Sequence, residues 1–168
     1  MLKAHLGHMA LFANDPVHLA EFYQNLFGME MVGKSSNNSS VFIGGGSVNE
    51  NHELAFIHNP KAAHIGLKVD SPEDLLAYYQ EIKARGLQII AVWNHGATLG
   101  MYIPDPEGNV VEIYWNTGRE DYQPPYFGPL DLEDQTQESL RKLVAEMPSQ
   151  HASPEKSLEQ ALSSLEEK

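Results

Sequence analysis

The feature that most constrains the fold is a repeat within the first half of the chain. Residues 8–24 (HMALFANDPVHLAEFYQ) align without a gap to residues 64–80 (HIGLKVDSPEDLLAYYQ), with six identities in seventeen positions. Both copies begin at a histidine, His8 or His64, and carry a proline eight positions later. Such self-similarity indicates two copies of one structural unit that bury a shared core.

Each copy predicts a short strand that begins at the histidine and is followed by a helix. Asp15-Pro16 and Ser71-Pro72 are start signals, because Asp or Ser caps the free amides and Pro is tolerated in the first turn. Gly28 and Gly86 are the matching stop signals. Apolar residues recur at helical spacing between them: Leu19, Phe22, Tyr23 and Leu26 in the first copy, and Leu75, Leu76, Tyr78, Tyr79 and Ile82 in the second.

Three extended segments follow each helix. We expect them at residues 29–32, 41–43 and 54–57 in the first copy, and at residues 87–93, 100–103 and 110–115 in the second. The chain is therefore predicted to be α+β, with two tandem βαβββ modules at residues 1–60 and 61–118. The modules would form one curved mixed sheet, and residues 119–168 would add a C-terminal arm and amphipathic helices.

The C-terminal part differs in character from the repeat. Residues 116–130 are rich in Pro, Gly and Tyr and indicate an extended arm or lid. Two amphipathic helices are expected after it, one around residues 140–147 and one beginning at Ser153. These helices could pack on the body or on a second subunit, and we expect a homo-oligomer.

Composition excludes several classes of function. The net charge of −12 argues against nucleic acid and anionic membranes as partners. The chain has no cysteine, so disulfides and thiolate metal ligands are excluded. No segment approaches the length of a membrane span, and no apolar run follows the first methionine, which indicates a soluble cytoplasmic protein.

Glu112 is the residue that raises the question of a metal. It lies between Val111 and Ile113 in an apolar strand, where a bare carboxylate is costly to bury. If the two modules pair face to face, His8 and His64 converge on it. Two imidazoles and a carboxylate form the site typical of mononuclear Fe(II), with Mn, Ni and Zn as alternatives. Core histidines and a solvent-facing Glu112 are the plainer alternative, but the matched histidines favour a metal within the curved sheet.

Three phrases of the sequence resemble a known family. LGHMALFANDP, FYQNLFGME and DPEGNVVEI, together with the repeat, are typical of the vicinal oxygen chelate superfamily over residues 5 to about 115. This superfamily includes glyoxalase I, extradiol catechol dioxygenases and bleomycin-resistance proteins. The order His-Gly-x-Thr-x-Gly from His95, then Tyr102, then Asp-Pro-x-Gly-Asn, then Glu112 is similar to the one-domain extradiol dioxygenases in particular.

The resemblance implies roles for the remaining polar residues. His52, which opens the segment HELAF, would be the catalytic acid/base, Tyr102 would hydrogen-bond the substrate, and His95 would lie near its outer oxygen. The metal would be Fe(II), or Mn(II) in its place, held by His8, His64 and Glu112. The substrates would be a small catechol-type aromatic diol and O2, and the ring would open beside its two hydroxyls.

Two other functions of the same fold stay open. A glyoxalase-like lyase or isomerase uses a second glutamate as a metal ligand, and the candidate is Glu53. Neighbours on a strand point to opposite faces, so an inward His52 would go with inward Leu54 and Phe56, and Glu53 would then point away. We expect His52 inward. A metal-free binding or resistance protein is the second alternative, and the complete set of three ligands argues against it.

Overall fold

The predicted α+β class is confirmed in the computed structural model, which describes residues 2–46, 50–122 and 124–149. Its elements are β1 (His5–Phe12), α1 (Pro16–Phe27), β2 (Glu30–Lys34), β3 (Ser40–Gly44), β4 (Leu54–Ile57), a 3₁₀ turn (Pro60–Ala62), β5 (His64–Val69), α2 (Pro72–Ala84), β6 (Ala91–Asn94), β7 (Thr98–Pro104), β8 (Val110–Asn116), β9 (Gly128–Pro129) and α3 (Gln137–Glu146).

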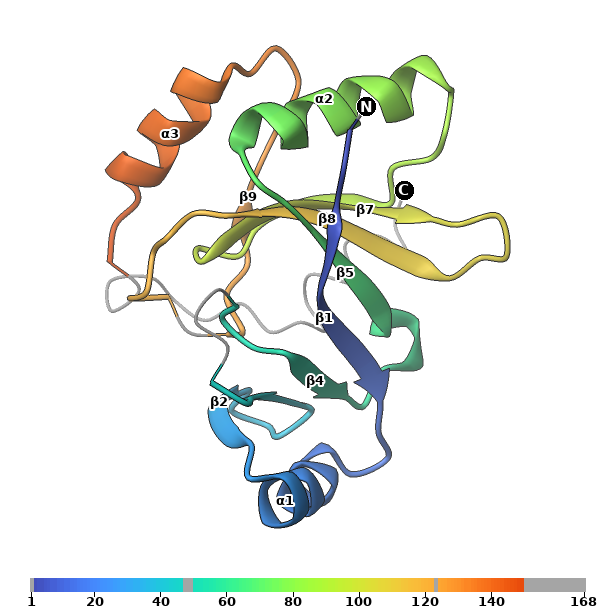
Figure 1. The fold of residues 1–168 in the computed structure, drawn as a ribbon, viewed down its shortest axis with the longest axis vertical. Helices are drawn as coiled ribbons and strands as arrows, with labels where there is room; N and C mark the ends of the chain where they lie inside the picture. Colours follow the sequence, from blue (N-terminus) through green and yellow to red (C-terminus); the bar gives the residue numbers. More distant parts are fainter. Residues whose placement is uncertain (1, 47–49, 123, 150–168) are drawn as a thin grey trace.

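All strands of the described residues join one curved sheet (Figure 1), in the order β2-β3-β4-β1-β5-β8-β7-β6-β9. Strands β1 and β5 pair antiparallel at its centre. On the outer side of each, β4 runs parallel to β1 and β8 runs parallel to β5. The two repeats of the sequence therefore meet along their first strands, and both histidine-bearing strands lie in the middle of the sheet.

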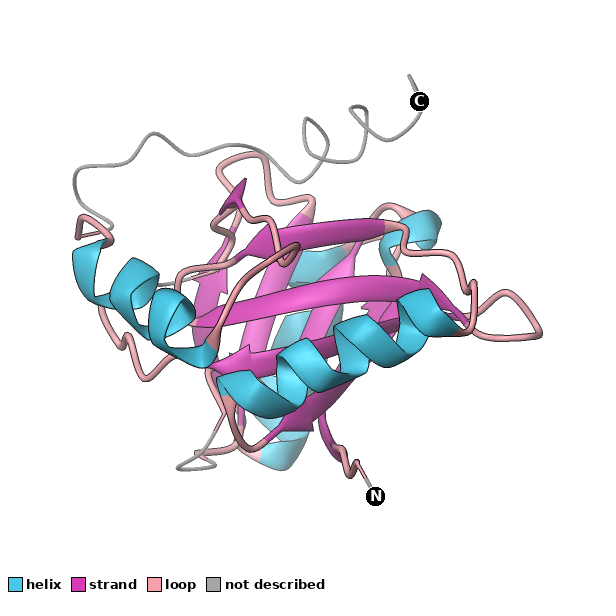
Figure 2. Ribbon diagram, turned by 90° about the horizontal axis from the view of Figure 1, so that it is seen from above, coloured by secondary structure: helices cyan, strands magenta, loops and turns pink. Residues whose placement is uncertain are grey.

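The helices cover the convex side of this sheet. Helix α1 packs on β3 and β4 through a cluster that includes Ala20 and Phe56. Helices α2 and α3 pack together over the other half (Figure 2), where Leu75, Leu99 and Leu140 belong to the largest apolar cluster. With both helical layers on one side, the opposite side of the strands is free to line a cavity.

The predicted helix signals act as expected. The Asp15 carboxylate accepts from the backbone N–H of His18, and the Ser71 hydroxyl accepts from that of Asp74. Gly28 ends α1 with a left-handed φ of 69°. Such a conformation favours glycine because it has no Cβ.

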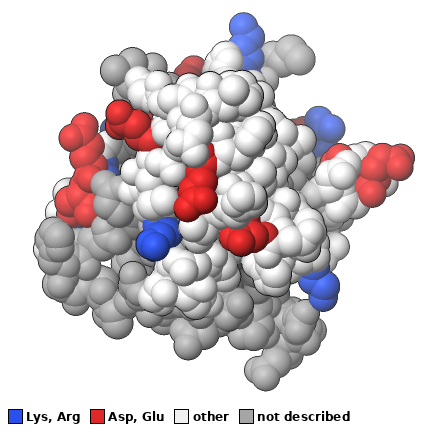
Figure 3. Space-filling model, turned by 90° about the horizontal axis from the view of Figure 1, so that it is seen from below, with Lys and Arg blue, Asp and Glu red and all other residues white. Residues whose placement is uncertain are grey.

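One strand start was predicted wrongly, and two apolar residues of α1 are exposed. The segment predicted as a strand from residue 87 forms β6 only from Ala91; the Ile90 N–H also donates to the carbonyl of Tyr102, whereas residues 87–89 lie in the connection that follows α2. In α1, Phe22 and Leu26 share the helical spacing of the apolar residues but are 51% and 62% exposed. The face of the molecule at the α1 end (Figure 3) is mostly uncharged, with acidic and basic side chains scattered over it.

The C-terminal arm crosses the open side of the sheet. Pro124 lies against Gly33 of the edge strand β2, and β9 then pairs with β6 near the opposite edge. The first predicted C-terminal helix is confirmed as α3, and its last carbonyls, those of Val144 and Met147, accept from the Arg119 guanidinium. The predicted second helix, from Ser153, lies outside the described residues. Across the described segments, no helix is long and apolar enough to cross a membrane.

Candidate metal centre and its cavity

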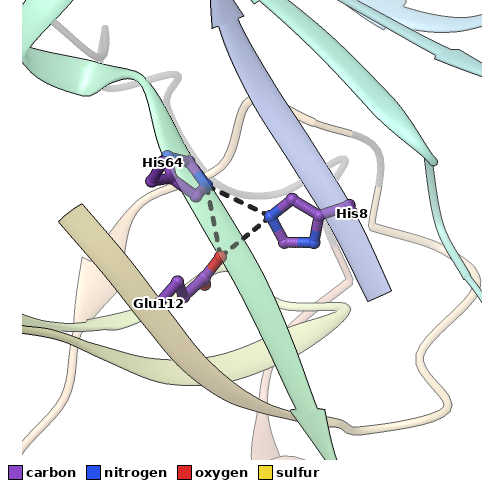
Figure 4. A group of neighbouring side chains, drawn as sticks. All are labelled: His8, His64 and Glu112. Atoms are coloured by element: carbon purple, nitrogen blue, oxygen red, sulfur yellow. Dashed lines mark hydrogen bonds and ion pairs between the residues drawn. The ribbon is translucent and has the colours of Figure 1, made fainter. Parts of the chain in front are cut away.

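His8, His64 and Glu112 converge on one point of the concave face (Figure 4). The Nε2 of His8 lies 3.0 Å from Oε2 of Glu112 and 3.1 Å from Nε2 of His64. The remaining side of the triangle, from His64 Nε2 to Glu112 Oε2, is 3.4 Å. We call these three residues the His–His–Glu group. Glu112 is 2% exposed, so its charge is compensated by the two imidazoles and not by water.

Strand register explains why the three side chains meet. Gly66 of β5 pairs with His8 on one side and with Glu112 on the other. A Cβ on Gly66 would lie 2.6 Å from both ring nitrogens of His8, so only glycine leaves room for the ring to lean across β5. His64 stands two residues before Gly66 and therefore points to the same face. Gly100 of β7 leaves similar room beside Glu112, whose Oε1 would be 2.9 Å from an added Cβ.

The protonation states within the group follow from its contacts. The Nδ1–H of His64 donates to the carbonyl of Ala62 (2.8 Å), which leaves Nε2 as the nitrogen that faces Glu112. Burial opposes a charge on His64, but the hydrogen bond and the negative charge of Glu112 raise its pKa above the ordinary value. Burial likewise opposes ionisation of Glu112, and the two histidines still hold its pKa well below the usual range.

This donor set fits a divalent transition metal. Two imidazole nitrogens and one carboxylate oxygen lie within 4.8 Å of one another, on three neighbouring strands of a rigid sheet. Imidazole suits Fe, Zn, Cu and Ni, and a carboxylate suits harder ions such as Mn. Three protein ligands that face a cavity would leave other positions of the metal open to substrate.

His95 and Tyr102 lie beside the His–His–Glu group and contact each other. The Nδ1–H of His95 donates to the carbonyl of Tyr126 (2.8 Å), so its Nε2 accepts from the Tyr102 hydroxyl (3.0 Å). Burial lowers the pKa of His95, which keeps this ring in the neutral form. Burial, and then the charge of Glu112, raise the pKa of Tyr102 well above its ordinary value, so its hydroxyl stays protonated.

His52 also reaches the cavity, although not for the reason expected from the sequence. Strand β4 begins at Leu54, after His52, and Leu54 and Phe56 pack toward α1 on the convex side. Their neighbours Ala55 and Ile57 line the cavity. The expected link between an inward His52 and inward Leu54 and Phe56 was therefore wrong, because strict alternation does not extend back to a residue that precedes the strand.

The His52 ring is packed against the ring of His8, with centroids 4.7 Å apart. Its Nδ1 is buried and has no hydrogen-bond partner among the described residues. Burial, followed by the charge of His8, lowers the pKa of His52 well below its ordinary value. The ring is thus a neutral imidazole next to the His–His–Glu group but outside it.

By strand alternation, Glu53 would point to the same face as Ala55 and Ile57. It nevertheless does not join the His–His–Glu group. Its carboxylate accepts from the backbone N–H of Gly45 at the end of β3. Among the described residues, the cluster able to hold a metal consists of the His–His–Glu group without Glu53.

The cavity above the group has a volume of about 120 Å³ and mostly apolar walls. Trp93 of β6 and Tyr126 and Phe127 of the C-terminal arm line this cavity. The ring of Phe127 lies 5.3 Å from that of Trp93 and 4.8 Å from that of His95. Further lining residues include Phe42, Ala55, Ile57, Ala62, Ile90, Ala91, Ala97, Thr98, Val110, Pro124 and Pro125.

Glu50 and Tyr114 are among the polar residues of the cavity that had no predicted role. The Tyr114 hydroxyl donates to the Glu50 carboxylate, and its ring lies 5.0 Å from that of His8. The signal that could have pointed to Tyr114 is its spacing, two residues after Glu112 and therefore on the same face of β8.

The comparison with known families identifies the superfamily of this chain. Residues 5–113 match the family model described as the Glyoxalase/Bleomycin resistance protein/Dioxygenase superfamily, and the chain belongs to it, as the resemblance predicted.

Individual relatives include both dioxygenases and a glyoxalase. Biphenyl-2,3-diol 1,2-dioxygenase 2 of Rhodococcus globerulus is 33% identical over 75 residues, which cover 38% of this chain and 40% of the relative. The crystal structure of a catechol 2,3-dioxygenase has a TM-score of 0.56 at 23% identity, over 66% of this chain and 40% of that one. The Mn(II)-bound glyoxalase from Novosphingobium aromaticivorans also has a TM-score of 0.56, at 17% identity, over 72% of this chain and 41% of its own. Each match spans less than half of the relative's length, and the two solved structures show a shared fold.

Proposed function

We propose that this chain is an extradiol, meta-cleaving dioxygenase, which uses Fe(II), or Mn(II) in its place, and O2 to open the ring of a catechol-type aromatic diol. The observation that carries the proposal is the set of residues around the cavity. Beside the His–His–Glu group lie the neutral imidazole of His52 and the hydrogen-bonded pair His95–Tyr102. The dioxygenases among its relatives support the same reaction class.

Fe(II) bound by the His–His–Glu group would lower the pKa of a bound catechol hydroxyl and leave open positions for substrate and O2. His52 would accept the proton of the second hydroxyl and return it as the ring opens. The ring suits this role because burial lowers its pKa, so it is a base near neutral pH, and because its Nδ1 has no competing partner among the described residues.

Tyr102 and His95 would orient the substrate. The raised pKa of Tyr102 keeps its hydroxyl protonated, and on substrate binding this O–H would turn from His95 Nε2 to a substrate oxygen and stabilise negative charge there. The Nδ1–H of His95 is fixed by the carbonyl of Tyr126, a residue of the C-terminal arm. The arm would therefore help to align the polar side of the site as well as cover it.

Oxygen uptake tests this proposal directly. The protein is loaded with Fe(II) under anaerobic conditions and mixed with catechol or 2,3-dihydroxybiphenyl in aerated buffer. We expect one O2 consumed per diol, together with the yellow ring-opened product. If protein that holds one iron per chain gives neither signal on a panel of catechols, the dioxygenase proposal is wrong.

A glyoxalase-like lyase or isomerase is the second candidate, and the strand phase of Glu53 is the observation that favours it. This glutamate shares the phase of the cavity-lining Ala55 and Ile57 and would need only to leave Gly45 to point inward. The assay is turnover of glutathione hemithioacetals by the Ni(II) and Zn(II) forms. Under the dioxygenase proposal, Glu53→Gln should change metal content and ring opening by less than about twofold. If Glu53 were instead a fourth metal ligand, Glu53→Gln should lower metal affinity or activity by about tenfold or more.

A further inference from the structure

We propose that Glu50 is a positioning residue, whose carboxylate ties the segment that carries His52 to strands β5 and β8. The tie is a three-residue cluster of Glu50, Lys68 and Tyr114, which we call the Glu50 clamp. The catalytic consequence rests on the proposed role of His52, but the clamp itself can be measured without turnover.

The Glu50 carboxylate uses both of its oxygens. The Tyr114 hydroxyl donates to Oε2 (2.6 Å), and the Lys68 ammonium group donates to Oε1 (2.8 Å). Only 12% of the Glu50 side chain and 21% of the Lys68 side chain are exposed, so water screens the pair weakly. Charge-assisted bonds of this kind are stronger than those between neutral groups.

The two donors come from the strands that hold the metal ligands. Lys68 lies on β5 four residues after His64, and Tyr114 lies on β8 two residues after Glu112, so both side chains share the concave face with those ligands. Gly7 of β1 makes room for the phenol, because a Cβ there would collide with the Tyr114 hydroxyl. Glu50 is thus anchored to the rigid centre of the sheet.

His52 needs such an anchor because regular pairing does not reach it. Among the described residues, the backbone hydrogen bonds that extend β4 begin at Glu53, which bonds to Ile43 and Met9. The Asn51 amide adds a hydrogen bond to the carbonyl of Tyr122, at 3.3 Å. Glu50 therefore provides a charged attachment on the N-terminal side of His52, in a segment without regular strand structure.

The position of the His52 ring matters for chemistry more than for binding. The ring fits between His8, at a centroid distance of 4.7 Å, and Phe42, at 5.0 Å. A misplacement of about 1 Å in a catalytic group can lower a rate by about a hundredfold. Without the clamp, we expect kcat to fall while metal content and KM stay close to those of the wild type.

The first test measures the clamp itself by hydrogen–deuterium exchange of the full chain loaded with Zn(II). In Glu50→Ala, the amides of residues 50–54 should exchange about tenfold faster or more, because local opening costs less free energy. Glu133→Ala is the matched control, since Glu133 also accepts from a tyrosine, Tyr79, and a lysine, Lys83, but on the exposed surface. Unchanged exchange at residues 50–54 in Glu50→Ala would overturn the proposal.

The second test asks whether Glu50 acts through His52. We expect Glu50→Ala to lower kcat about tenfold or more with KM within about twofold, and to have no further effect when His52 is already alanine. Equal losses in both backgrounds would show that Glu50 acts by another route. Glu50→Gln keeps one acceptor oxygen and should recover part of the rate.

If Glu50→Ala does not fold, Tyr114→Phe serves in its place, because it removes one hydrogen bond and keeps the ring against His8. It should raise exchange at residues 50–54 less than Glu50→Ala, and no change would again contradict the clamp. If the wild-type chain opens no catechol ring, the proposed function fails, and the exchange measurement still decides whether the clamp exists.

Discussion

At the scale of single residues, the protonation of His64 links the site to pH. Its pKa is raised in the metal-free chain because its imidazolium form is stabilised by Glu112. A metal needs the neutral nitrogen, so metal and proton compete for Nε2.

We therefore expect Zn(II) binding at neutral pH to release a proton, and the affinity to fall as the pH is lowered through the raised pKa of His64. Calorimetry in two buffers with different ionisation enthalpies measures the number of protons released. His18→Ala is a control, because that imidazole is on the surface of α1 and should change neither value. Binding that is independent of pH between 5.5 and 8, with no proton released, would contradict the proposed role of His64.

His52 and His8 touch each other but should behave differently when replaced. His52→Ala should keep its iron and lose ring-opening activity by about 10²–10⁴-fold, the usual contribution of a general acid/base. His8→Ala should lose the metal itself, because it removes one of the three ligand atoms. Metal analysis beside turnover separates the two, and loss of iron from His52→Ala would show that His52 is a ligand.

At the scale of elements, the site depends on three neighbouring strands, β1, β5 and β8. Gly66 stands between His8 and Glu112, and any side chain there would enter the space of the His8 ring. The backbone at Gly66 is not in the left-handed region, so the requirement for glycine is one of space.

Gly66→Ala should therefore weaken metal binding strongly and destabilise the fold by about 1–3 kcal/mol, the usual cost of overpacking. Gly44→Ala in β3 is the matched control, because its new Cβ would meet only the Val32 side chain, at 3.4 Å. Chemical unfolding and Zn(II) titration of both variants check the expectation. Full metal affinity in Gly66→Ala would mean that His8 can coordinate from another position.

Most helices and strands could be predicted from the sequence, but some side-chain positions could not. The repeat and its capping residues predicted the helices and the central strands, because these signals are local and occur twice. The face on which the His52 side chain lies could not be predicted in this way, because side-chain alternation holds only inside a strand and β4 begins at Leu54. Phe22 and Leu26 share the apolar spacing of α1 but are exposed, because helical spacing defines an apolar stripe and not the width of the surface that covers it.

At the scale of the whole molecule, the C-terminal arm closes the cavity. The Arg119 guanidinium ties the start of the arm to the end of α3, and Pro125, Tyr126 and Phe127 then line the cavity. The convergence of His8, His64 and Glu112 could be predicted from the repeat and from a carboxylate in an apolar strand. The arm's contacts could not, because they join β2 to a segment about ninety residues later and leave no periodic signal in the sequence.

The contact between the arm and β2 gives a test of closure. A Cβ on Gly33 would collide with the carbonyl oxygen of Pro124, and a backbone atom cannot rotate aside as a side chain can. Gly33→Ala should therefore push the arm away from β2 and open the cavity. Because Phe127 would lose its place beside Trp93 and His95, we expect KM for an aromatic diol to rise about tenfold, roughly the value of one aromatic contact.

Metal affinity should stay at the wild-type value in Gly33→Ala, since the His–His–Glu group lies on strands that the arm does not position. Steady-state kinetics and Zn(II) titration measure the two quantities, and limited proteolysis within residues 119–129 reports directly on release of the arm. Gly44→Ala again serves as the control on the neighbouring strand. Unchanged KM together with faster cleavage of the arm would show that the arm covers the cavity without contacting the substrate, and the aromatic wall would then have to be assigned to the stability of the fold.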